Sequence, residues 1–187
     1  MEELCIRLAQ IYPLPEPALS KFLSIWKSTS YEKGAHLLKT GQISNYMYFV
    51  GKGAVRIYYQ KEEKEITEWL ALDNNFFFSI QSFFQRVPSR LAIHALENSE
   101  VFMMHHDDLM QLCEQSHETE KLFRKMITTS LILSQIRMES IQFENAHQRY
   151  QRLLSSSPDI LRRVPLSYIA SFLGITQETL SRVRNAR

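Results

Sequence analysis

The C-terminal stretch LSYIASFLGITQETLSRVRNAR carries polar side chains whose spacing puts them on one face of a helix. Ser181 comes four residues after Gln177, and Arg182 comes four residues after Glu178; separations of three and four residues align on a helix. Arginine can pair with a guanine edge, and glutamate can accept a hydrogen bond from the amine of cytosine. These residue types indicate the chemistry of base recognition in a DNA groove.

Small and apolar residues around this face provide the framework that would position it. If Leu166 is the first residue of a twenty-residue unit, Ala170 is fifth and Gly174 is ninth. The five apolar positions that would pin one helix on the other are Ile169, Leu173, Ile175, Leu180 and Val183. This pattern predicts a helix-turn-helix, with glycine in the turn and Thr176 as the N-cap of the second helix. The alternative is a helical hairpin that only packs or binds protein.

Charge is distributed unevenly along the chain. The segment up to Ile136 has a net charge of −2, whereas the segment from Arg137 onward has eight arginines against four acidic residues, a net charge of +4. We expect phosphate contacts from Arg162, Arg163 and the last helix. The predicted DNA-binding residues are Thr176, Gln177, Glu178, Thr179, Ser181, Arg182, Arg184 and Arg187.

Composition restricts the possible classes of protein. The chain has 187 residues, 44% of them apolar, and lacks the roughly 18 uninterrupted apolar residues that a membrane span needs. Acidic residues near the N-terminus differ from the basic start of a secretory signal, so we expect a cytoplasmic protein without a membrane partner. Cys5 and Cys113 stand alone and predict no disulfide framework.

Catalytic and metal-binding chemistry is not indicated. No nucleophile–base pair, phosphate-cradling loop or paired-carboxylate site stands out, so we expect no enzymatic activity and no cofactor. His105 and His106 are adjacent and therefore point in different directions. With no third ligand spaced nearby, we interpret them as a surface turn rather than a metal site.

The N-terminal part alternates between apolar and polar residues in short runs. YMYFV, AVRIYY and EITEWLAL are such runs, and four of the five glycines lie between Gly34 and Gly53. This pattern predicts an antiparallel β-sandwich or roll, with at most a short helix at SIQSFF. The fold class is therefore α+β.

A long helical stretch follows, from about His117 to Leu154, with neither glycine nor proline. One heptad seam predicts a dimer interface at Leu122, Met126, Thr129, Leu133, Ile136, Ser140 and Phe143. A second stripe with Phe123, Ile127 and Leu131 could face the β-rich part. The alternative is a core helix within one chain. We predict three regions, 1–116, 117–145 and 146–187.

The order of β-roll, long helix and terminal motif resembles the cyclic-AMP receptor/FNR family of bacterial transcription regulators, most strongly at PLSYIASFLGITQETLSRVR. The resemblance implies an N-terminal cyclic-nucleotide-binding-like sensor, a homodimer joined through the long helix, and a palindromic double-stranded DNA site. RNA polymerase and an unidentified small-molecule effector are further candidate partners. Gln177, Glu178 and Arg182 match base-contacting positions of the family, although many members have arginine where Gln177 stands.

Two departures from the family concern the chain end and the nucleotide site. The chain stops at Arg187, so we expect a helix-turn-helix that lacks the β-hairpin wing of many members. Nucleotide-binding members have a Gly-Glu pair and, about ten residues later, an arginine. Here Phe78 and Ser79 replace the pair, Ser89 replaces the arginine, and Arg90 comes one residue late. In a strand this shift would turn Arg90 to the opposite face.

Five phenylalanines surround this cassette: Phe76, Phe77, Phe78, Phe83 and Phe84. Either they fill the pocket so that no effector binds, or they wall an apolar cavity rimmed by Ser79, Ser82 and Arg90. In both cases we expect no binding of cyclic AMP. The leading hypothesis is a homodimeric transcription regulator that binds DNA. The alternative is a small-molecule sensor whose terminal helices contact a protein partner.

Overall fold

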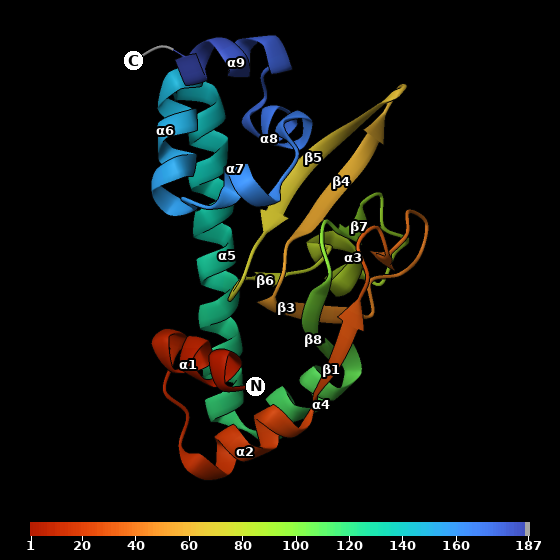
Figure 1. Cartoon of the computed structure of the whole chain (residues 1–187). Coiled ribbons are helices and arrows are strands. Elements are labelled where there is room, and N and C mark those ends of the chain that lie inside the picture. The colour runs from red at the N-terminus through yellow and green to blue at the C-terminus, as the bar shows by residue number, and fades with distance from the viewer. Residues whose placement is uncertain (186–187) are drawn as a thin grey trace.

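The computed structural model describes residues 1–185. The chain begins with two helices that the sequence patterns did not predict. Helix α1 spans Glu2–Ile11 and helix α2 spans Glu16–Ser24. Leu4, Leu8 and Phe22 on their inner faces are fully buried. In Figure 1 both helices lie near the lower end of the long helix α5, and α1 also contacts strand β3. They therefore cover the β-rich part with a helical layer.

Within residues 1–185, eight strands form two four-stranded antiparallel sheets, which confirms the predicted roll. The first sheet has the order β1 (Trp26–Tyr31), β8 (Ser99–His105), β3 (Tyr46–Lys52), β6 (Phe76–Phe77). The second has the order β2 (His36–Leu38), β7 (Ala92–Ala95), β4 (Val55–Lys61), β5 (Lys64–Ala71). In β3 the residues from Met47 to Val50 are all buried, because helices cover the face of the first sheet that the second sheet does not.

Gly53 shows why the turn between β3 and β4 requires glycine. Its φ is +132°, and a Cβ atom there would lie 2.2 Å from Oγ of Ser99. The Gly53 N–H donates to Oδ1 of Asp73 at 2.7 Å. Any larger residue would therefore displace this turn and weaken its bond to Asp73.

Two short helices complete the β-rich part. The predicted short helix at SIQSFF is confirmed as α3 (Ile80–Gln85). Helix α4 (His106–Gln115) has Asp107 and Asp108 in its first turn, where carboxylates interact favourably with the helix dipole and stabilise the helix. His105 caps α4, because its Nδ1 accepts the Asp107 N–H at 3.2 Å. Cys5 and Cys113 are both free thiols and half-buried, and burial raises the pKa of the Cys113 thiol to about 11.

The long helix α5 spans His117–Phe143, shorter than the predicted stretch to Leu154. It ends because Asn145 starts a new helix, α6 (Ala146–Ser156), with a capping box. The Asn145 side chain accepts the Gln148 N–H, and the Gln148 side chain accepts the Asn145 N–H. The seam prediction is wrong for Leu122 and Met126, which are buried in the core of their own chain.

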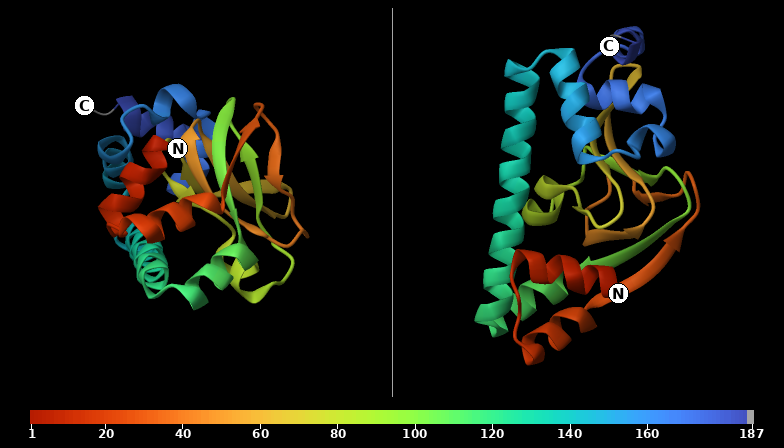
Figure 2. Two further views of the ribbon diagram at one scale, coloured as in Figure 1. Left: turned by 90° about the horizontal axis from the view of Figure 1, so that it is seen from below. Right: turned by 60° about the vertical axis from the view of Figure 1, so that its left-hand side comes forward.

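After α6 the chain forms three more short helices: α7 (Ile160–Arg163), α8 (Leu166–Leu173) and α9 (Gln177–Asn185). With α6 they share a second core around Tyr150, Ile160 and Leu180. This core includes Leu70 and Leu96 of the β-rich part, so the terminal helices pack directly on the sheet. In the right-hand view of Figure 2 they lie beside the upper half of α5. No helix within residues 1–185 meets the length and apolarity required to traverse a bilayer.

Candidate DNA interface and effector cavity

Helices α8 and α9 are joined by the turn that the sequence predicts. Gly174 adopts a left-handed conformation with φ of 66°, which ends α8 without steric strain. The hydroxyl of Thr176 accepts the Thr179 N–H at 3.1 Å, as expected for an N-cap. Ala170 and Leu180 are almost completely buried, so the two helices approach closely at a small side chain.

The polar face of α9 is open to solvent. Gln177, Glu178, Ser181 and Arg182 are all exposed, and Arg182 has 71% of its side chain accessible. Nη2 of Arg182 lies 3.2 Å from Oε1 of Glu178 one turn earlier. The structure therefore gathers the four predicted base-reading side chains on one accessible face.

The other predicted DNA-binding residues have different surroundings. Thr176 and Arg184 are exposed, whereas Thr179 is half-buried and its Oγ1 lies 2.9 Å from that of Thr176. Arg162 is exposed and pairs with Asp159 on its own short helix. Arg187 lies outside the described residues. Thr179 is therefore engaged with the Thr176 side chain at the N-cap of α9 and does not have a free side chain for DNA.

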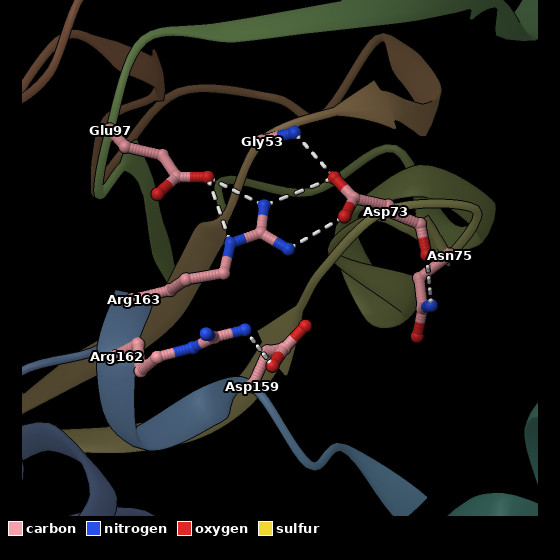
Figure 3. Close-up of polar contacts among 7 residues, drawn as sticks. All are labelled: Gly53, Asp73, Asn75, Glu97, Asp159, Arg162 and Arg163. Carbon is pink, nitrogen blue, oxygen red and sulfur yellow. Dashed lines mark hydrogen bonds and ion pairs between the residues drawn. The ribbon is translucent and has the colours of Figure 1, made fainter.

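Arg163 does not have the free side chain that a phosphate contact requires. Its guanidinium donates to both carboxylate oxygens of Asp73, at 2.6 and 3.0 Å. It also donates twice to Oε1 of Glu97, at 3.1 and 2.5 Å (Figure 3). The expectation of a phosphate contact from Arg163 is therefore wrong for this structure, because two carboxylates of the β-roll already occupy the side chain.

The β4–β5 hairpin supports helix α8 through a further contact, made by Arg56 of β4. Arg56 is fully buried, and its guanidinium carbon lies 3.8 Å from the centre of the Tyr168 ring. Its charge is balanced by Glu65, 2.5 Å away, and Thr67 accepts from its Nε at 2.9 Å. Burying an arginine is costly unless it is paired and hydrogen-bonded, and here both conditions are met.

His94 lies in the same layer, beside Arg56. Its ring is 5.0 Å from that of Tyr58 and 6.2 Å from that of Tyr168, measured between centres. Burial and the adjacent Arg56 charge lower the pKa of His94 to about 4. The imidazole is therefore neutral at pH 7 and adds no second positive charge to that of Arg56 beneath α8.

A cavity of about 640 Å³ lies between the β-roll, α3 and α5. Phe76, Phe77, Phe78 and Phe84 line it, together with Trp69, Met126 and Leu133, while Phe83 is buried in the core instead. Four of the five phenylalanines therefore wall a space rather than fill it. Its volume lies in the range of small-molecule sites.

The three serines of the predicted pocket line this cavity and are hydrogen-bonded. The Ser89 hydroxyl lies 2.9 Å from the hydroxyl of Ser79 and accepts the Leu91 N–H at 3.0 Å. The Ser82 hydroxyl donates to the carbonyl of Val87 at 2.6 Å and accepts the Ser44 N–H. All three side chains are buried neutral groups, and none can balance an anion's charge.

Arg90 lies at the rim of the cavity, so the prediction that a one-residue shift in a strand turns it to the opposite face is wrong. The segment from Arg86 to Leu91 is irregular, so Arg90 precedes strand β7 rather than lying within it. Both Ser89 and Arg90 border the cavity, and Arg90 is exposed. Glu68 is the nearby carboxylate: burial raises its pKa, while Arg137 and Arg90 act in the opposite direction.

The exposed half of α5 carries apolar side chains on two stripes. The predicted stripe includes the exposed Leu133, Ile136 and Phe143, together with the half-buried Thr129 and Ser140. Phe123 and Ile127 pack against the core as predicted, but Leu131 does not face the β-rich part and is 68% exposed. With Met138 and Ile141 it forms a second exposed stripe, which the predicted interface did not include. Contiguous exposed apolar side chains of this kind mark interaction surfaces.

Comparison with known proteins agrees with this arrangement. Residues 28–116 match the model of the cyclic nucleotide-binding domain. No curated protein matches the chain by sequence. FixK2 from Bradyrhizobium japonicum is 20% identical, with a TM-score of 0.73 over 86% of this chain and 83% of that one.

Two other solved structures are similar over nearly the whole chain. The catabolite activator protein of Thermus thermophilus is 20% identical over 96% of this chain and 85% of its own, with a TM-score of 0.59. A protein from Eubacterium rectale assigned to the crp/fnr family is 16% identical, with coverages of 94% and 86% and a TM-score of 0.69. Residues 28–116 therefore form a cyclic nucleotide-binding-type domain, and the chain has the fold of the cyclic-AMP receptor/FNR transcription regulators.

Proposed function

We propose that the protein is a homodimeric, non-enzymatic transcription regulator that reads a palindromic DNA site with helix α9. The observation that carries the proposal is the exposed face of Gln177, Glu178, Ser181 and Arg182, held by a buried framework on its other side. Their donors and acceptors suit base edges in the major groove. The arginine-rich segment around them supplies the charge that attracts phosphates.

Dimerisation follows from the apolar stripes of α5. Two copies of α5 in parallel would cover Leu133, Ile136 and Phe143 and bring both α9 helices to the same end of the assembly. Figure 1 shows α9 at the end of α5 opposite to α1 and α2. Two recognition helices related by a two-fold axis match a palindromic site.

The cavity suggests an effector other than a cyclic nucleotide. We infer that a small, mainly apolar molecule occupies it in the cytoplasm, because aromatic and aliphatic side chains together line much of it and neutral serines replace the anchoring charges. RNA polymerase remains a candidate partner, in keeping with the transcriptional role of similar folds.

A mobility-shift titration tests the function directly. Full-length protein is titrated against duplex DNA from upstream of its own gene, with shuffled duplex of equal length as the control. We expect a retarded complex that survives excess shuffled competitor. Equal retention of both duplexes, or no retention at all, would favour terminal helices that contact a protein partner instead.

A further inference from the structure

The four terminal helices touch the β-roll at opposite ends of α8. At the end where α8 begins, Arg163 precedes Pro165 and Leu166 and pairs with Asp73 and Glu97. At the other end, the Ser171 hydroxyl accepts the Thr67 N–H at 2.8 Å. Two fixed points along one helix determine its direction, which a single point would not do.

The second fixed point also includes Phe172. Its ring packs edge-on against Trp69 of β5, with centres 6.1 Å apart. Arg137 of α5 donates to the Phe172 carbonyl at 2.9 Å, and its guanidinium lies over the ring at 4.0 Å. The end of α8 that leads into the turn and α9 is thus held by both the sheet and the long helix.

Arg163 is the charged component of this attachment. Its side chain is 21% exposed and forms ion pairs with two carboxylates from two different loops (Figure 3). The hydrogen bonds that Arg163 donates to Asp73 and Glu97 raise the pKa of Arg163 above its ordinary value. Burial alone would raise the pKa of Asp73, but the bonds from Arg163 and Gly53 outweigh it and lower that pKa. Arg163 and Asp73 therefore remain charged at neutral pH.

Each fixed point is connected to residues that line the cavity. Asp73 belongs to the tight turn that leads into Phe76 and Phe77, and Asn74 in that turn has a positive φ of 65°. The Asn74 N–H and the Asn75 carbonyl both bond to Val50, so the turn is rigidly tied to β3. Trp69 lines the cavity itself, and Arg137 lies one helical turn beyond Leu133, which also lines it.

We propose that Arg163 is a positioning residue: it fixes the direction of the DNA-reading helices and, through Asp73, ties that direction to the wall of the cavity. This inference rests on the proposed function for its DNA consequence, but the attachment itself can be measured without DNA. Coupling of this kind is reciprocal, so loosening the helices must also loosen the Asp73 turn.

Hydrogen–deuterium exchange of the full-length protein tests the attachment. In Arg163→Ala we expect exchange about tenfold faster or more, both in residues 160–173 and in the turn at 72–77. Arg163→Lys, which keeps the charge but not the fork of donors, should give an intermediate rate. The control is Arg162→Ala, the neighbouring arginine that pairs with Asp159 at the N-cap of its own helix, and it should leave the 72–77 turn at the wild-type rate.

DNA binding separates positioning from phosphate contact. For Arg163→Ala we expect affinity to fall about tenfold, or about 1.4 kcal/mol, with an unchanged salt dependence. A phosphate ligand would instead reduce the salt slope by about one. Unchanged exchange in the turn together with a reduced slope would overturn the inference. Faster exchange in a protein whose wild type binds no DNA would support the attachment and refute the proposed function.

Discussion

The hydroxyl of Ser89 lies 2.9 Å from the hydroxyl of Ser79, so these two side chains are hydrogen-bonded to each other inside the cavity. By resemblance, these positions hold the arginine and the glutamate that anchor a cyclic nucleotide. Their contact supports the alignment, because residues ten apart in sequence meet where the alignment requires. It also shows that neither side chain offers a charge to a ligand.

We predict that the protein does not bind cyclic AMP or cyclic GMP at physiological concentrations. A cyclic phosphate remains charged, and an unpaired buried charge costs several kcal/mol. Each 1.4 kcal/mol of lost interaction lowers affinity about tenfold. Calorimetric titration of the ligand-free protein with both nucleotides is the measurement. Micromolar binding that disappears in Arg90→Ala would show that the rim arginine replaces the missing anchor.

We predict that Arg182→Ala relaxes base preference at one position in each half-site. A good bidentate contact is worth about 1–3 kcal/mol of discrimination. The matched control is Arg184→Ala, an exposed arginine two residues later on the same helix and therefore on another side of it. It should weaken binding to all sequences alike and flatten the salt dependence. Binding-site selection with each variant measures both effects, and an unchanged motif for Arg182→Ala would refute the assigned orientation of α9.

We predict that the double variant Leu133→Glu/Ile136→Glu is monomeric in sedimentation-velocity ultracentrifugation. Both side chains are exposed in one copy, so placing charges there should disrupt an interface between copies without unfolding the chain. Circular dichroism checks that the fold is retained.

The second stripe of α5 provides the comparison for this experiment. Leu131→Glu/Met138→Glu introduces the same charges on the other exposed stripe of the same helix. If this variant is monomeric while Leu133→Glu/Ile136→Glu remains a dimer, the interface lies on the second stripe and the predicted seam is wrong.

We predict that acid weakens the packing of α8 on the β-roll through His94. Because burial and Arg56 lower its folded pKa to about 4, the unfolded chain binds more protons between about pH 6.5 and 4. The stability that the neutral His94 contributes to the folded state is therefore fully present above about pH 6.5 and is lost as the pH falls toward 4. His36, Glu65 and the rings of Tyr58 and Tyr168 also face this imidazole.

Thermal unfolding of His94→Gln and wild type at pH 7 and pH 5 checks this prediction. The decrease in Tm between the two pH values should be smaller in the variant, because glutamine does not titrate. The nearby His36→Gln is the control for loss of an imidazole, since its side chain is exposed and bonded to Tyr58 at the surface. An equal decrease in His94→Gln and wild type would contradict the prediction.

Local patterns predicted most of the elements. Glycine-punctuated alternation identified the roll, and the spacing from Ala170 to Val183 identified α8, the turn at Gly174 and the Thr176 cap. Each of these features depends on residues close in sequence. The break before α6 could also have been found, because Asn145 and Gln148 have the spacing of a capping box.

Contacts between distant residues could not be predicted in this way. Arg163 is 90 residues from Asp73 and 66 from Glu97, so its sequence neighbourhood suggested only a free cation. Similarly, Leu122 and Met126 fit a heptad with Leu133, but the first two are buried in the core of their own chain and only the third is exposed. A periodic helix pattern indicates which residues are apolar without indicating which neighbour covers them.

Selection from a pool of random duplex DNA with the full-length protein tests the central claim most directly. A homodimer reading DNA with α9 should enrich an inverted repeat with half-site centres about 10–10.5 base pairs, or a multiple of this, apart. The triple variant Gln177→Ala/Glu178→Ala/Arg182→Ala should lose that enrichment while retaining its fold. Enrichment of no motif, or of a motif without two-fold symmetry, would contradict the account.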